Sequence, residues 1–146
     1  MTRGFFKSAG IVLVCFISLL GCNPDDPQTP EATALAFEKL AGEWTLGTNG
    51  KILLDEINVS ANYPGFSLSF TDGTYNTTNA GELLPASGTW EWADREARKV
   101  ILDGTLEVDL VTLTESSFTF TFDHTTGTDR PVVAGYNGTY VITVNK

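Results

Sequence analysis

The chain has 146 residues, of which 42% are apolar and 18% are charged, and its 18 acidic and 9 basic side chains give a formal charge of −9. This length suits one domain with a single core, and the apolar fraction is too high for a disordered acidic tail. An excess of carboxylates would repel nucleic-acid phosphates. We therefore expect neither a multidomain enzyme, nor a nucleic-acid binder, nor an intrinsically disordered protein.

The N-terminus has the pattern of an export signal, which we place over residues 1–21. Two basic residues precede an apolar run of about 12 residues, whereas a transmembrane helix needs about 20. The sequence Leu19-Leu20-Gly21-Cys22 resembles the bacterial lipobox, in which the signal is cleaved before the cysteine and the thiol receives diacylglycerol. The resemblance implies a mature chain that begins at a lipidated Cys22. An ordinary secretory signal that contains a cysteine is the alternative.

The cysteine count agrees with lipidation. Cys15 lies within the signal, so Cys22 is the only thiol of the mature chain and cannot form an internal disulfide. A single myristoyl chain binds a membrane only marginally, so the two or three chains of a lipoprotein are what would make the attachment permanent. We expect an outer-membrane lipoprotein of a Gram-negative envelope, on the periplasmic face or the cell surface. The acidic pair Asp25-Asp26 resembles surface-export signals of some Gram-negative lipoproteins.

A tether and a helix follow the expected cleavage site. Residues 22–30 contain three prolines, which cannot pack, and they predict an extended lipidated tether. The domain then covers residues 31–146 and begins with one short helix over residues 31–41. Thr29-Pro30 offers an N-cap and a first-turn proline for this helix, and Gly42 ends it.

The rest of the chain predicts strands and turns. Residues 117–122 alternate strictly, so that three phenylalanines share one face, and residues 67–70 and 139–144 alternate less strictly. About eight short strands in meander order predict an antiparallel barrel or a sandwich. Periodicity does not decide between these two folds. Glycine-containing turn signals, which suit hairpins, stand at residues 49–50, 72–73, 80–81, 103–104 and 137–138.

The alternation changes phase within one segment. Val108 and Leu110 share one face, whereas Val111 and Leu113 have the opposite parity. A β-bulge near Leu110 would return both later residues to the core, and such bulges bend barrel strands.

One motif favours the barrel. Leu40-Ala-Gly-Glu-Trp44 resembles the Gly-x-Trp motif that opens the lipocalin fold, in which the Trp closes one end of an up-and-down barrel of eight strands. Residues 65–75 and 85–92 are similar to stretches of bacterial lipocalin-like lipoproteins. The resemblance covers residues 38–146 and implies an all-β, up-and-down antiparallel barrel of about eight strands, preceded by one short helix.

Two features depart from the lipocalin pattern. Lipocalins usually bring a basic residue from the last strand onto the opening Trp, but the late candidates here, Arg130 and Lys146, lie outside the final apolar run. Lipocalins also place their main helix after the barrel, and this chain has none there. The resemblance therefore implies a trimmed barrel, and it supplies no substrate.

Trp90 and Trp92 are two residues apart, so both indoles lie on one side of their strand. If that side faces inward, they line the barrel, either around a pocket for a small apolar or amphipathic ligand or within a packed aromatic core. If it faces outward, they form a platform for stacking a sugar. The candidate ligand-binding residues are Trp44, Phe70, Trp90, Trp92, Phe118, Phe120 and Phe122.

We expect no enzyme, cofactor or metal site. His124 stands beside Asp123 without a nucleophile in a suitable context, and we expect it to be solvated at a strand end. Glu107 and Asp109 predict a solvated outer strand face, although paired carboxylates can act on glycosides. Residues 94–99 predict a charged loop, and no ligand set for zinc or calcium is present.

The sequence therefore favours a lipid-anchored envelope protein whose barrel binds a small apolar or amphipathic ligand. The alternative is a surface-displayed module with a solid barrel core that binds a glycan or another protein. The lipid on Cys22 implies the membrane as a partner, and the sequence does not identify a protein partner. A cavity of roughly a few hundred Å³ would favour the first function, and a filled barrel with exposed indoles would favour the second.

Overall fold

A computed structural model describes residues 31–125 and 137–146. The signal over residues 1–21, the tether with Cys22, and Arg130 lie outside these residues. Helix α1 comes first and is followed by strands with one short 3-10 helix, η1. The elements are α1 (Ala32–Leu40), β1 (Gly42–Thr45), β2 (Lys51–Leu54), β3 (Ile57–Asn58), η1 (Ser60–Asn62), β4 (Ser67–Thr71), β5 (Thr74–Thr78), β6 (Ser87–Trp92), β7 (Lys99–Leu102), β8 (Leu106–Leu113), β9 (Ser117–His124) and β10 (Gly138–Asn145).

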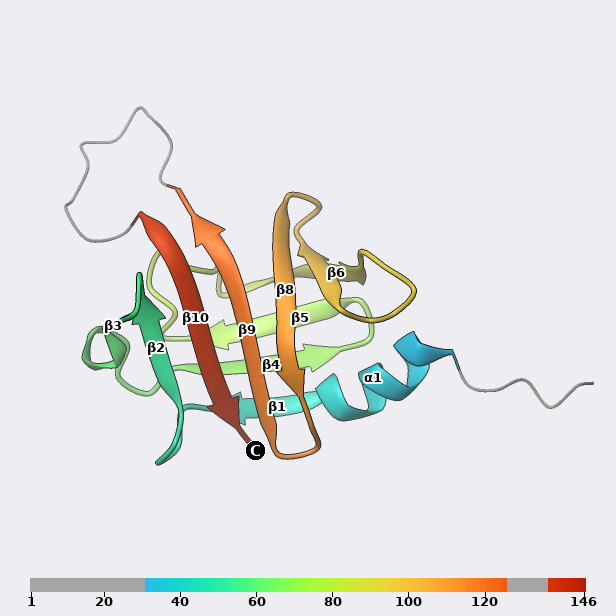
Figure 1. The fold of residues 1–146 in the computed structure, drawn as a ribbon, viewed down its shortest axis with the longest axis horizontal. Coiled ribbons are helices and arrows are strands. Elements are labelled where there is room, and N and C mark those ends of the chain that lie inside the picture. The colour runs from blue at the N-terminus through green and yellow to red at the C-terminus, as the bar shows by residue number, and fades with distance from the viewer. Residues whose placement is uncertain (1–30, 126–136) are drawn as a thin grey trace, which may run out of the picture.

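The strands form a closed antiparallel barrel in the order β1-β4-β5-β6-β7-β8-β9-β10 (Figure 1). Closure between β1 and β10 is narrow. It consists of the pair Thr45–Asn145 and a 3.3 Å hydrogen bond from the Asn145 side chain to the Leu46 carbonyl. The prediction of an eight-stranded up-and-down barrel preceded by one short helix is confirmed, and the sandwich is wrong.

β2 shares a position in the wall with β1. Both strands run antiparallel to β10, β1 beside its end and β2 beside its earlier residues, so they are two parts of one interrupted strand. The Gly50 amide donates to the Leu46 carbonyl at 2.6 Å, and a Cβ on Gly50 would lie 2.1 Å from that oxygen. Only glycine fits this loop. The turn signal at residues 49–50 therefore interrupts a strand, whereas such signals ordinarily reverse the chain in a hairpin.

The alternating pattern places the core as predicted. Phe118, Phe120 and Phe122 of β9 are all buried, and β10 contributes buried side chains at every second position. The β-bulge is confirmed, because the register between β8 and β9 shifts between Leu110 and Thr112. The expectation that it returns Val111 to the core is wrong. The extra residue of a bulge is left out of the ladder, and here that residue is Val111, which is 60% exposed.

The two ends of the barrel are covered differently. Helix α1 lies across one end, where the Trp44 indole donates to the Leu40 carbonyl at 2.8 Å and Phe37 packs against Trp90 (Figure 1). Buried loop residues cover the other end, among them Tyr63 and Phe66. Within the described part of the chain, α1 is too short and no other helix is long and apolar enough to cross a membrane.

Candidate functional site

The seven predicted ligand-binding residues form one continuous chain of ring contacts. It runs from Trp92 through Trp90 and Phe70 to Phe118, with centroid distances of 5.1, 5.7 and 6.2 Å. From Phe118 it branches to Trp44 at 5.6 Å and continues along β9 through the other two phenylalanines, at 4.8 and 6.2 Å. All but Trp92 are at most 7% exposed. Aromatic rings therefore fill the barrel along this path.

Trp44 contacts both helix α1 at the start of the domain and Lys146 after strand β10. Besides its bond to α1, its ring lies 4.4 Å from the Lys146 ammonium, which also donates to the Lys39 and Ala41 carbonyls at 2.7 Å each. Because Lys146 lies outside the final apolar run, the sequence did not predict that it would stack on Trp44 as a basic residue does in lipocalins. The structure corrects that reading, because the pairing of β1 with the end of β10 brings the next residue over the ring.

Trp92 is the candidate residue that leaves the core. It ends β6, is partly buried, and lies between two grooves that border the N-terminal part of α1. The larger groove, of about 720 Å³, lies beside the β6–β7 loop, and the smaller, of about 360 Å³, lies beside the β4–β5 turn. Both grooves also touch Thr33. Sequence reasoning grouped Trp92 with the interior residues because parity does not show where a strand passes the barrel rim.

The indole of Trp92 also differs from the other two in its hydrogen bonding. The N–H groups of Trp44 and Trp90 donate to the carbonyls of Leu40 and Thr71, each at 2.8 Å. The Trp92 N–H has no hydrogen-bond partner among residues 31–125 and 137–146. An apolar ring with an unused donor at a groove is suited to a ligand that is partly polar.

Carboxylates surround this indole. The two grooves are lined by four acidic residues and by one basic residue, Arg95. Neither Asp72 nor Glu91 forms an ion pair with any described residue. The grooves therefore offer hydrogen-bond acceptors in a negative field. The four acids are Glu31, Asp72, Glu91 and Asp94.

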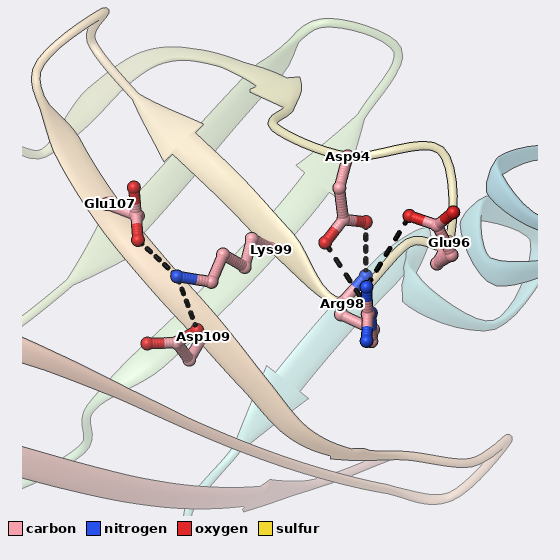
Figure 2. A network of polar contacts seen from close by, with 6 residues as sticks. All are labelled: Asp94, Glu96, Arg98, Lys99, Glu107 and Asp109. Atoms are coloured by element: carbon pink, nitrogen blue, oxygen red, sulfur yellow. Dashed lines mark hydrogen bonds and ion pairs between the residues drawn. The ribbon is translucent and has the colours of Figure 1, made fainter.

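The charged loop over residues 94–99 contains a local set of polar contacts around Arg98. Asp94 accepts a 2.8 Å hydrogen bond from the Arg98 amide, and the Arg98 guanidinium lies 3.8 Å from Asp94 and 3.6 Å from Glu96 (Figure 2). The arginine is largely exposed, so these ion pairs add little stability. Their effect is to hold Asp94 at the edge of the larger groove.

The remaining sequence candidates lie elsewhere. Glu107 and Asp109 stand on the outer face as predicted, where Lys99 bridges them, and hydrogen bonds to Glu107 and then Asp109 raise the pKa of Lys99 (Figure 2). His124 was expected to be solvated, which is wrong for its Nε2. That atom is buried without a partner among the described residues, and the ring lies 6.1 Å from Tyr140, because the even positions of β9 face inward.

Sequence reasoning missed one polar contact. The buried Tyr75 hydroxyl donates to Asp103 at 2.6 Å, and the other oxygen of Asp103 accepts from the Thr89 amide at 2.9 Å. A Cβ on Gly88 would lie 2.2 Å from Asp103, so glycine is required there. Burial, with the hydrogen bond and charge of Asp103, raises the pKa of Tyr75. The contact pins β5 to the β7–β8 turn, and Asp103 was recognised only as a turn residue.

Neither metal binding nor similarity assigns a function. Across residues 31–125 and 137–146, no three His, Cys, Asp or Glu side chains gather closely enough to hold a metal ion. No protein-family model, curated protein or solved structure matches the chain. What the protein binds has to follow from the chemistry of its own surface.

Proposed function

We propose that this protein is a lipocalin-like lipoprotein, anchored through a lipid on Cys22 in a Gram-negative outer membrane. The lipobox sequence supports the anchor. The closed barrel and the lysine stacked on Trp44 support the lipocalin resemblance, because a basic residue over the opening Trp is a usual feature of that family. Its role is binding and not catalysis.

The ligand we propose is a neutral glycan bound beside Trp92. The observation that carries this proposal is the partly buried indole of Trp92, set between two grooves lined by carboxylates, whose N–H has no partner among the described residues. A flat aromatic face packs against the apolar face of a pyranose ring, and carboxylates accept hydrogen bonds from its hydroxyl groups. Four acids against one arginine would repel anionic sugars, so the glycan should be uncharged.

Replacement of the indole tests this function. The full chain is screened against an array of neutral bacterial envelope oligosaccharides, and the best glycan is titrated by calorimetry. We expect Trp92→Ala to weaken binding about tenfold or more, which corresponds to about 1.4 kcal/mol. The control is Leu35→Ala, which removes an exposed apolar side chain of α1 that lines neither groove. Equal binding by both variants, or no glycan bound, would contradict the proposal.

The second candidate is binding of a small apolar or amphipathic ligand inside the barrel. What favours it is the largely apolar inner wall, since the buried residues of the described part of the chain are aliphatic or aromatic. The aromatic rings would have to separate to admit the ligand. A lipophile that co-purifies with the membrane-extracted protein, or a change in Trp fluorescence with added fatty acid, would support this candidate over the first.

A further inference from the structure

β8 and β9 are paired along only part of their length. Their ladder ends at the pair Asp109–Thr121, although β8 begins at Leu106 and β9 continues to His124. Beyond that pair, β8 still pairs with β7 and β9 still pairs with β10. The two strands therefore separate toward the β7–β8 turn, as Figure 1 shows.

Two carboxylates would oppose each other if the strands stayed paired here. Two residues beyond the last pair, the same register would place Glu107 directly opposite Asp123. Like charges at opposing positions destabilise an antiparallel pair. Each carboxylate is instead held by the strand on its far side. Lys99 of β7 binds Glu107, and the Thr139 hydroxyl of β10 donates to Asp123 at 2.6 Å.

The separation leaves a slot in the barrel wall. A groove of about 560 Å³ lies there, lined by Leu106 and Glu107 from β8 and by Phe122 and Asp123 from β9, among others. The buried Phe122 thus forms part of its floor. The slot is distinct from the grooves beside Trp92, which lie at the α1 end.

Backbone groups that have no ladder partner among the described residues face this slot from both sides. On β8 the Leu110 amide donates to Arg98 on the β7 side at 2.7 Å, so by alternation the N–H and C=O of Glu107 point toward β9. On β10 the Thr139 carbonyl accepts a 3.0 Å hydrogen bond from the Asp55 amide, so the backbone groups of Thr139 point toward β2. By alternation, the backbone groups of Tyr140 point toward β9, and those of its partner Phe122 point back toward β10. Asp123, the next residue of β9, therefore points its backbone groups toward β8.

We propose that this slot binds an extended, cationic peptide segment of a partner protein, which adds as a strand between β8 and β9. Unpaired strand edges are templates for strand addition. Three carboxylates, those of Glu107, Asp109 and Asp123, face one lysine here, so a segment with alternating basic side chains complements the charge. A second copy of this acidic chain would bring like charges together.

The probe is a capped hexapeptide of alternating lysine and threonine, added to the full chain in mild detergent. We expect saturable binding in which amide hydrogen exchange slows at Glu107 and Asp123. A peptide of the same charge, N-methylated at alternate residues, cannot donate to one of the two strand edges, because successive N–H groups point to opposite neighbours, and it should bind about tenfold more weakly or worse. Equal binding of the two peptides, or no binding of the first, overturns strand addition.

Closing the slot gives a second test. Asp123→Lys replaces the repulsion by an attraction to Glu107, so the strands should pair, the Glu107 amide should be protected without peptide, and binding should fall about tenfold or more. Glu115→Lys makes the same charge change in the β8–β9 turn at the other end and should keep most of the binding. Equal losses in both variants would mean that charge alone attracts the peptide, and the proposal fails. Asp123→Asn, a milder variant, also removes the repulsion if the lysine disturbs folding.

Discussion

Two neighbouring residues at the tip of the β2–β3 hairpin occupy the left-handed region, Asp55 with φ 46° and Glu56 with φ 70°. Two-residue hairpin loops of this kind ordinarily use Asn-Gly or Asp-Gly. Asp55 is compensated, because its amide donates to the Thr139 carbonyl and its carboxylate accepts from the Thr139 amide, both at 3.0 Å. Glu56 makes no side-chain hydrogen bond or ion pair with a described residue, so its backbone strain is uncompensated.

Glu56→Gly should therefore stabilise the protein. A non-glycine residue in this region costs about 1–2 kcal/mol, and the greater freedom of glycine in the unfolded chain offsets part of the gain, so we expect the free energy of unfolding to rise by ~1 kcal/mol. Urea denaturation measures it. Glu43→Gly, in strand β1 and without a positive φ, should instead lower the free energy of unfolding. A loss of stability in Glu56→Gly would show that the strain argument is wrong.

Lys146 joins the end of the chain to the start of the barrel. Lys146→Met keeps an apolar stem but removes the ammonium over Trp44 and both hydrogen bonds to carbonyls, so we expect a loss of about 1–2 kcal/mol. Thermal unfolding followed by Trp fluorescence measures it. Lys51→Met on β2 removes a lysine that has no ion pair among the described residues and should change the melting temperature little. Equal shifts for the two variants would argue against the stacking.

At the scale of elements, local patterns predicted those features that local physics determines. The alternating phenylalanines of β9 predict its inward face, and the change of parity in β8 predicts its bulge. Both follow from the sequence because strand periodicity is a property of the backbone. Features that depend on register between distant segments could not be found this way. The interruption between β1 and β2 is seen only in the pairing of both strands with β10. The separation of β8 from β9, and the opposition of Glu107 to Asp123 that the same register would give beyond it, are seen only once that register is known.

The same distinction holds for the candidate site. Trp92 was identified as a candidate, but its unused N–H depends on where α1 covers the barrel and where β6 passes the rim. The contact of Lys146 with Trp44 depends on the β1–β10 closure. The Tyr75–Asp103 bond joins residues 28 positions apart, and no sequence signal marks it.

That bond between elements should give the protein a dependence on alkaline pH. The pKa of Tyr75 in the folded protein is raised above its ordinary value of 10.0. Above pH 10 the phenol therefore ionises in the unfolded chain first, so the stability that the Tyr75–Asp103 bond contributes is present below pH 10 and is lost as the pH rises above it. We expect Tyr75→Phe to cost about 1–3 kcal/mol at neutral pH and to lose less stability than the natural chain on going above pH 10. Urea titrations across this range measure both effects. Asp103→Asn keeps an acceptor for the Thr89 amide and should cost less at neutral pH. Parallel pH curves for Tyr75→Phe and the natural chain would contradict this account.

At the scale of the whole molecule, the two proposed surfaces lie at opposite ends of the barrel. The grooves beside Trp92 lie at the end that α1 covers, and the slot between β8 and β9 opens toward the β7–β8 turn at the other end. A chain lipidated on Cys22 would reach α1 through residues 22–30, which span about 30 Å at most when fully extended. The α1 end should therefore lie nearer the membrane, beside surface-bound glycans, and the slot should face soluble partners.

Lipid quenching tests this orientation. The Cys22 sulfur, once it carries diacylglycerol, does not react with a maleimide. A single introduced cysteine can therefore be labelled with a fluorophore, either Glu115→Cys in the β8–β9 turn or Thr105→Cys in the β7–β8 turn. In vesicles that carry a headgroup spin label, the fluorophore at position 115 should be quenched more strongly, because that turn lies at the α1 end while position 105 lies about 25 Å away along the eight-residue strand β8. The same labelled positions in a chain that begins at residue 23, which lacks the signal, Cys15 and the site for the lipid, should show no quenching. Equal quenching at the two positions in the anchored protein would show that the barrel has no fixed direction, and stronger quenching at position 105 would place the slot toward the membrane.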